Sequence, residues 1–157
     1  MSVERSLDDF LEFSSLITGF GAYHLRGTGL VELYLTTVTE IVGDATMKAL
    51  LGAYRNAADE AAGDAALLER SVRRVIMSDP KLGPVTRHLI KLWYVGTWYG
   101  LPREWREAYG ENEKDRTFVV SAGAYVEGLL WPAIGANPSG AKPLGYGMWA
   151  TPPRIEE

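Results

Sequence analysis

Apolar side chains recur at three- and four-residue intervals along the chain up to about residue 133, which is the spacing of amphipathic helices. The run 30–42 is rich in Val, Ile, Thr and Tyr and would also suit a strand, but no second run of comparable β character offers it a partner. We therefore interpret it as a helix. The predicted helices cover residues 6–18, 30–42, 45–58, 65–79, 84–98 and 121–133. The pattern predicts an all-α fold, a small bundle of five or six helices.

Residues that favour helix ends support these limits. The predicted N-caps are Ser6 in a capping box with Asp9, Asp44, Asp64 and Ser121. Pro80 should stop the helix before it, and Pro84 suits the first turn of the helix that follows. Glycines punctuate residues 18–29, which are predicted as a loop, and residues 100–116 are predicted as a loop that ends in a charged, solvated turn.

The end of the chain has a different composition from the helices. Residues 137–153 are rich in proline and glycine, which sustain neither a helix nor an inner strand, so an extended arm is expected. The arm nevertheless carries Tyr146, Met148 and Trp149, large apolar groups that disordered linkers usually lack. We predict a helical domain over residues 1–136 and, over residues 137–157, an arm laid on this chain's own helices or on another protein.

Tryptophan is concentrated in the second half of the chain. All five tryptophans, residues 93, 98, 105, 131 and 149, lie beyond residue 92. Clustered aromatic residues usually build a core, but they are also enriched at interface hot spots. We expect Trp93 and Trp131 to favour the core and Trp149, on the arm, to favour an interface.

Composition narrows the classes of function. The 157 residues carry 16 basic and 20 acidic side chains, and the basic ones are scattered, which is unlike a nucleic-acid-binding surface. No apolar run approaches a membrane span of about 18 residues, and the N-terminal stretch lacks the pattern of a signal peptide. We expect a cytoplasmic protein with no direct membrane span.

The residues show no clear catalytic centre. The chain has no cysteine, and its only histidines are His24 and His88, whereas a zinc site generally needs three or four ligands. The glycines between residues 19 and 29 follow a predicted helix instead of a strand, so they do not form a dinucleotide-binding turn. Neither a phosphate-binding P-loop nor a GxSxG nucleophile motif occurs. The chain itself is expected to bind no cofactor and no metal, and an interaction subunit is the natural hypothesis.

Three segments, in the same order along the chain, carry a resemblance to a known family. They are SLDDFLEFSSLITGFGAYHLRGTGLVELYL at 6–35, LIKLWYVGTW at 89–98 and WPAIGANPSGAKPLGYGMWATPP at 131–153. They resemble the opening helix and loop, the WY-x-G helix end and the closing Pro/Gly arm of the small (gamma) subunit of bacterial FAD-dependent sugar and polyol dehydrogenases. This group includes glucose, fructose and sorbitol dehydrogenases and is akin to gluconate 2-dehydrogenase subunit 3.

The resemblance implies a non-catalytic partner of a much larger FAD-containing subunit of the glucose-methanol-choline oxidoreductase type. The family's small subunit assists maturation of the large one and carries it across the inner membrane through a twin-arginine leader. A cytochrome c subunit often accepts the electrons. This chain departs from the pattern, because it shows no twin-arginine leader and no cysteine in the closing arm. The expected location is therefore the cytoplasm, or the periplasm if such a leader was removed or is supplied by a partner.

The resemblance and the aromatic content of the arm together indicate which residues contact the large subunit. The predicted partner-binding residues are Trp93, Tyr94, Pro143, Tyr146, Met148, Trp149, Pro152 and Pro153. Two alternatives remain open. The chain could be an independent enzyme or small-ligand binder with His24 or His88 as its polar group, and its pocket would be walled by Trp93, Tyr94, Trp98 and Tyr99. It could also be a homo-oligomer that buries its arm on a second copy.

Overall fold

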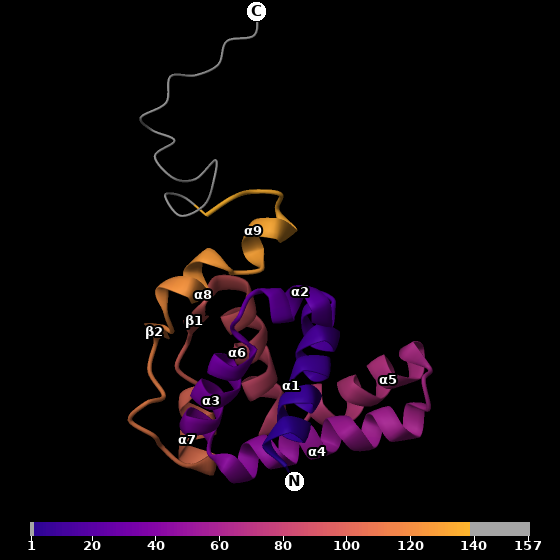
Figure 1. Cartoon of the computed structure of the whole chain (residues 1–157). Helices are drawn as coiled ribbons and strands as arrows, with labels where there is room; N and C mark the ends of the chain where they lie inside the picture. The colour runs from indigo at the N-terminus through magenta and orange to yellow at the C-terminus, as the bar shows by residue number, and fades with distance from the viewer. Residues whose placement is uncertain (1, 139–157) are drawn as a thin grey trace, which may run out of the picture.

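The computed structural model describes residues 2–138 and confirms the all-α class (Figure 1). The two strands, β1 and β2, form one short antiparallel pair, in which Thr97 faces Val119 and Trp98 faces Phe118. The elements in chain order are α1 (Val3–Thr18), α2 (Ala22–Gly27), α3 (Val31–Val42), α4 (Asp44–Ala61), α5 (Ala65–Val72), the π-helical segment η1 (Arg73–Met77), α6 (Leu82–Val95), β1 (Thr97–Trp98), α7 (Arg103–Tyr109), β2 (Phe118–Val119), α8 (Ala122–Val126) and α9 (Leu130–Ala133).

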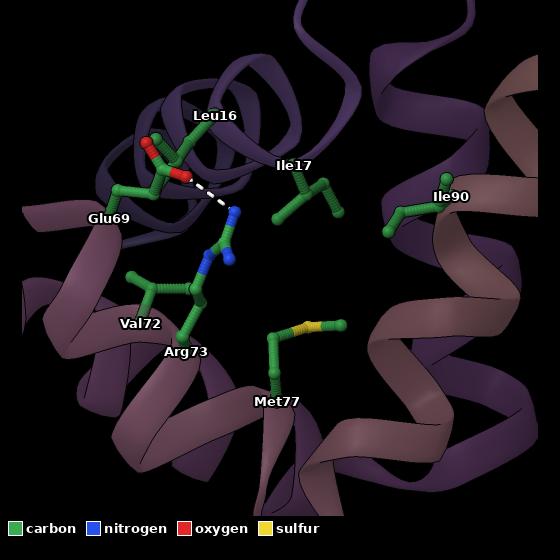
Figure 2. Close-up of a pocket in the computed structure, with 7 residues that line it drawn as sticks. All are labelled: Leu16, Ile17, Glu69, Val72, Arg73, Met77 and Ile90. Carbon is green, nitrogen blue, oxygen red and sulfur yellow. Dashed lines mark hydrogen bonds and ion pairs between the residues drawn. The ribbon is translucent and has the colours of Figure 1, made fainter.

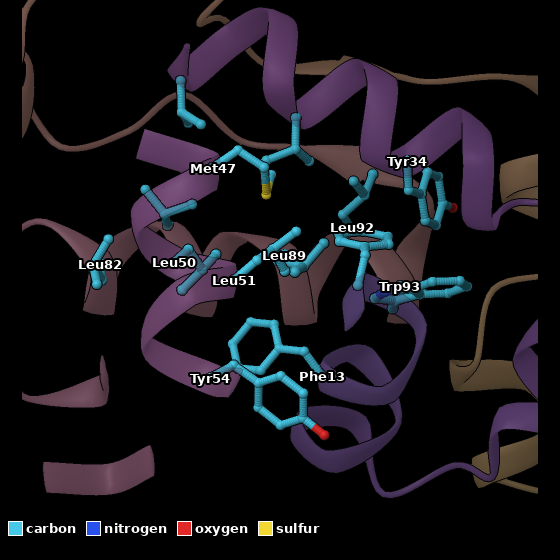
Figure 3. Close-up of a cluster of buried hydrophobic side chains, with 14 of the residues drawn as sticks. Phe13, Tyr34, Met47, Leu50, Leu51, Tyr54, Leu82, Leu89, Leu92 and Trp93 are labelled. Atoms are coloured by element: carbon cyan, nitrogen blue, oxygen red, sulfur yellow. The ribbon is translucent and has the colours of Figure 1, made fainter. Parts of the chain in front are cut away.

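The core lies where α1, α3, α4 and α6 pack on one another (Figure 3). Each of these helices contributes apolar side chains from one face, and Phe13, Leu50 and Leu89 have no accessible surface. The ring of Phe13 packs against that of Tyr54, with centroids 5.4 Å apart. Burial of these apolar faces supplies most of the helices' stability, because isolated helices of this length are marginal in water.

The ambiguous segment 30–42 is a helix, as predicted. Tyr34, Val38 and Ile41 are buried at the spacing of one helical face, against α1, α4 and α6. The Thr39 hydroxyl donates a hydrogen bond of 2.6 Å to the Leu35 carbonyl oxygen, a pattern that lets threonine sit inside a helix. Tertiary burial therefore outweighs the strand preference of its β-branched residues.

The start of α1 differs from the predicted capping box. Ser2 is the N-cap, and its hydroxyl accepts a hydrogen bond from the Arg5 amide, so α1 begins at Val3. Asp9 is not part of a cap, because its carboxylate forms an ion pair with Arg55 of α4. The capping-box prediction was wrong because α1 begins earlier, so Ser6 lies inside the helix and Ser2 satisfies a free amide at its start.

The other predicted caps are mostly confirmed. The Asp64 carboxylate accepts from the Leu67 amide, and the Ser121 hydroxyl accepts from the Ala124 amide. Asp44 is the first residue of α4, so its prediction as an N-cap was wrong by one position. A carboxylate in the first turn is still favourable, because it faces the positive end of the helix dipole.

Two segments predicted as loops contain short helices. Gly19 ends α1 with a φ of 78°, and α2 then forms within the glycine-rich segment. Leu25 of α2 is completely buried, so this short helix is held by packing. Helix α7 forms in the second predicted loop, where Trp105 is buried and donates a 2.8 Å hydrogen bond from Nε1 to the Lys81 carbonyl oxygen. Short helices of this kind depend on tertiary contacts, which local sequence patterns do not reveal.

Asp115 is the buried exception in the charged turn before β2, where Glu111, Glu113, Lys114 and Arg116 are exposed as predicted. Its side chain is 6% exposed, and its Oδ1 atom accepts hydrogen bonds of 3.0 Å from both the Trp98 Nε1 and the Leu101 amide. The turn is also tied to α3, because Asn112 and Lys114 both bond to Glu40, through its carbonyl oxygen and its carboxylate respectively. A single buried carboxylate thus joins this turn to the segment that follows α6.

We expect Asp115→Ala to lower the free energy of unfolding by about 2–4 kcal/mol, because it leaves two buried N–H donors without an acceptor. Asp115→Asn keeps an acceptor oxygen and should lose clearly less. Chemical denaturation followed by circular dichroism measures both variants. An equal loss in the two would show that the hydrogen bonds to Trp98 and Leu101 contribute little.

The two core tyrosines predict a loss of stability at alkaline pH. Burial, reinforced by the neighbouring Glu12 carboxylate, raises the pKa of Tyr54 to about 12, and burial also raises the pKa of Tyr34 above its usual value of 10. The folded state keeps these protons where the unfolded chain releases them, so stability present below pH 10 is lost as the pH rises towards 12. Each tyrosine should contribute a slope of about 1.4 kcal/mol per pH unit.

Tyr34→Phe tests this expectation. The Tyr34 hydroxyl has no hydrogen-bond partner among the described residues, so its removal should leave stability at neutral pH unchanged or slightly raised. The alkaline slope should become shallower by about 1.4 kcal/mol per pH unit. The exposed Tyr23→Phe is the control. Identical alkaline slopes in wild type and Tyr34→Phe would contradict the assignment.

Candidate partner-binding face

Helices α2, α8 and α9 lie together at the top of Figure 1, and each carries a large apolar side chain that is exposed. We call this end of the molecule the tail-end face and define it by Tyr23 of α2, Tyr125 of α8, and Leu130 and Ile134 of α9 and its C-cap. Tyr23 is 93% exposed and Ile134 is 63% exposed. Large exposed apolar groups gathered at one end of a protein are typical of interaction sites.

A hollow of about 200 Å³ lies between α2 and the α8–α9 region on this face. Its walls are His24 of α2, the α8–α9 connection with Glu127, Trp131 of α9, and Ala136 and Asn137. Asn137 is the first residue of the predicted arm, so the arm begins beside α2. The start of the arm and the exposed side chains of α2 therefore belong to the same surface.

The backbone of the α8–α9 region is fixed against the end of α6. The Leu129 amide donates a 3.0 Å hydrogen bond to the Trp93 carbonyl oxygen. Gly96 ends α6 with a φ of 70°, and a Cβ there would lie 2.5 Å from the backbone of α8. A Cβ on Gly128 would lie 2.8 Å from the Tyr94 carbonyl oxygen. Glycine is required at both positions, because only glycine allows the two backbones to approach this closely.

Trp131 is only half-buried, so the expectation that it favours the core is not met. It forms a small cluster of its own with Tyr125, in which the two rings meet edge to face with centroids 5.7 Å apart. The Trp131 Nε1 donates a 2.9 Å hydrogen bond to the Tyr125 carbonyl oxygen, and the Ala136 amide bonds to the Trp131 carbonyl oxygen. This cluster holds the chain in place as it approaches the arm.

The structure corrects the predicted role of Trp93. Its side chain is completely buried and packs edge to face on Tyr34, with ring centroids 4.7 Å apart. It offers no surface to a partner and supports the tail-end face from below. Tyr94 is half-buried, and its hydroxyl donates a 2.8 Å hydrogen bond to the Thr18 carbonyl oxygen at the end of α1. A contact between Tyr94 and a partner stays a prediction.

The remaining predicted partner-binding residues, all on the arm, lie outside the described residues. They are Pro143, Tyr146, Met148, Trp149, Pro152 and Pro153. Sequence reasoning did not single out Tyr23 or Ile134. The one available signal was that each is a large apolar residue outside the predicted helices. Tyr23 lies in a predicted loop, and Ile134 directly follows a predicted helix.

The two histidines have different surroundings. His24 is exposed on the tail-end face, with its ring 5.0 Å from that of Phe20. His88 is buried between two carbonyl oxygens, with Nδ1 2.8 Å from that of Pro84 and Nε2 3.2 Å from that of Gly100. The prediction of a partly buried, structural His88 agrees with these contacts. Among the described residues, no group of three or more His, Cys, Asp or Glu side chains could hold a metal ion.

The aromatic pocket of the alternative hypothesis is not open in this structure. Trp93 and Trp98 are both completely buried, so they cannot wall a pocket that a ligand enters. Tyr99 is partly exposed, and the Lys91 ammonium lies 5.6 Å from its ring centroid. The four residues therefore belong to different environments and form no common binding surface.

No protein-family model, curated protein or solved structure matches this chain. Within residues 2–138, no helix combines the length and the apolar character that a membrane crossing requires.

Proposed function

We propose that this chain is a non-catalytic small subunit. It binds and stabilises a larger FAD-dependent subunit of the glucose-methanol-choline type, which oxidises CH–OH groups of sugars or polyols. The flavin and the chemistry belong to that partner. The contribution of this chain is a binding surface made of the tail-end face and the arm that begins there.

One observation supports this proposal above the others. The three segments that carry the resemblance, 6–35, 89–98 and 131–153, lie next to one another in the fold, as far as their residues are described. Tyr94 bonds to Thr18, the Trp93 carbonyl oxygen accepts from Leu129 just before the third segment, and His24 shares a hollow with Trp131. Residues far apart in the sequence thus pack together at the end of the molecule where the arm begins, which supports an interface there.

The proposed role is physical, not chemical. A subunit that binds only the folded, FAD-loaded form of its partner stabilises that form in proportion to the logarithm of its own concentration over Kd. The arm suits this role, because proline narrows the conformations of the free chain and so reduces the entropy lost on docking. Exposed apolar anchors such as Tyr23 and Ile134 would then lose their contact with water in the complex.

We expect the double variant Tyr23→Asp/Ile134→Asp to fold normally and to weaken binding of the flavoprotein by at least about tenfold, since it places charges in a desolvated contact. The measurement is co-purification of flavin with tagged full-length chain from its own cells, followed by titration. Val3→Asp is the matched control, because Val3 is exposed and lies at the start of α1, away from α2. Flavin retention equal to the control would count against the tail-end face as the interface.

A further inference from the structure

A second hollow, which shares no lining residue with the hollow of the tail-end face, opens between α1, the α5–η1 helix and α6 (Figure 2). Its volume is about 470 Å³, within the range of small-molecule sites. Most of its wall consists of aliphatic side chains and a methionine thioether, and within residues 2–138 the charged side chains that line it are one arginine and one glutamate. The lining residues are Leu16, Ile17, Glu69, Val72, Arg73, Met77 and Ile90.

The Arg73 guanidinium is the polar feature of this hollow. Figure 2 shows it reaching from η1 towards Leu16 and Ile17, at the edge of the open space. Its Nη2 atom lies 2.6 Å from the Glu69 carboxylate. Within residues 2–138 the other N–H groups of the guanidinium have no hydrogen-bond partner, so one edge of it is available to an anion.

The helical segment beside this hollow carries more basic than acidic side chains. The segment 65–77 carries three arginines, Arg70, Arg73 and Arg74, against the single acidic residue Glu69. This stretch is therefore positive although the whole chain has a formal net charge of −4. Arg70 and Arg74 do not line the hollow, so Arg73 is the basic side chain that a ligand carboxylate would contact directly.

The backbone at this hollow is unusual. Residues 73–77 form a π-helical turn, closed by a 3.1 Å hydrogen bond from the Ser78 amide to the Arg73 carbonyl oxygen. Arg73 and Met77, the first and last residues of this turn, both line the hollow. Single π-helical turns occur frequently at functional sites, where the wider turn repositions side chains. This observation is independent of the charge and the shape of the hollow.

We propose that this hollow binds a medium-chain aliphatic carboxylate, with its hydrocarbon tail against Ile17, Met77 and Ile90 and its carboxylate on the free edge of Arg73. The apolar wall accounts for the tail, because burial of each methylene is worth about 0.8 kcal/mol. The guanidinium accounts for the head group, because arginine pairs with carboxylates through two parallel N–H groups. The site is separate from the tail-end face and independent of the proposed function.

Isothermal titration of the full-length chain with decanoate, kept below its micelle concentration, tests the proposal, with decanol as the uncharged ligand. We expect saturable one-to-one binding of decanoate. Arg73→Ala should weaken decanoate by at least about fivefold and leave decanol within about twofold. Arg74→Ala is the matched control, because this neighbouring arginine does not line the hollow. Its effect on decanoate should stay within about twofold.

Met77→Trp fills the hollow and should weaken both ligands by at least about tenfold. Its melting curve is recorded first, and if it does not fold, the comparison of the two exposed arginine variants decides. The proposal is overturned by any of three results. These are no saturable heat with decanoate, equal effects of Arg73→Ala and Arg74→Ala, or binding that appears only above the micelle concentration.

Discussion

A chain that ends at Ala136 is expected to remain a folded helical protein and to lose binding to the proposed flavoprotein partner. The core helices α1, α3, α4 and α6 all lie before this point, so the loss of the arm should not unfold them. The removed arm carries the predicted anchors Tyr146, Met148 and Trp149. Co-purification of flavin with tagged full-length and shortened chains measures the effect, and circular dichroism of the shortened chain confirms its fold.

A single substitution makes the same test more selective. Trp149→Ala should weaken the complex by about 2 kcal/mol or more, as the truncation of an interface hot spot does. The matched control is Trp149→Phe, which keeps an aromatic ring at the same position and should weaken the complex clearly less than alanine. Full retention of the flavoprotein by the shortened chain would refute the arm as an anchor.

Trp93→Ala is expected to lower the free energy of unfolding of the isolated chain by about 3–5 kcal/mol, the usual cost of removing a buried aromatic side chain. The side chain is completely buried and contacts Tyr34, and its own carbonyl oxygen holds Leu129. Chemical denaturation of the isolated chain measures the loss. Partner binding should weaken as well, but only because the tail-end face loses its support.

Trp93→Phe separates the two possible roles of this residue. It keeps an aromatic ring in the core and should cost clearly less stability than alanine. Partner binding by Trp93→Phe should stay close to that of the wild type. If Trp93→Phe were as stable as the wild type but no longer bound the partner, Trp93 would have to contact the partner directly.

The helices that sequence alone predicted best are those with a long apolar face. Tyr34, Val38 and Ile41 repeat at helical spacing, and this periodicity outweighed the β-branched residues around them. Helices α2 and α7 could not be found in this way. Each is at most seven residues long and is held by one buried side chain, Leu25 or Trp105, whose burial depends on the assembled core.

The sequence indicated which segments build the candidate site, but not which of their side chains are exposed. The WY-x-G motif was singled out from the sequence, and the structure gives each part a physical role. Trp93 fills the core, Tyr94 ties α6 to α1, and Gly96 lets α8 approach. Which of these side chains reaches the surface depends on how α6 is rotated against α1 and α3. Asp115 was missed for a related reason, because its partners Trp98 and Leu101 lie 17 and 14 residues away.

The account depends on the claim that this chain binds a flavin-carrying protein through its tail-end face and arm. The most direct measurement is the absorption spectrum and flavin content of the complex that the tagged full-length chain retains after purification from its own cells. We predict bound FAD in a stoichiometric amount, carried by a much larger polypeptide, and its loss in Tyr23→Asp/Ile134→Asp. A chain that is purified without flavin, or that keeps the same flavin content in this double variant, would contradict the account.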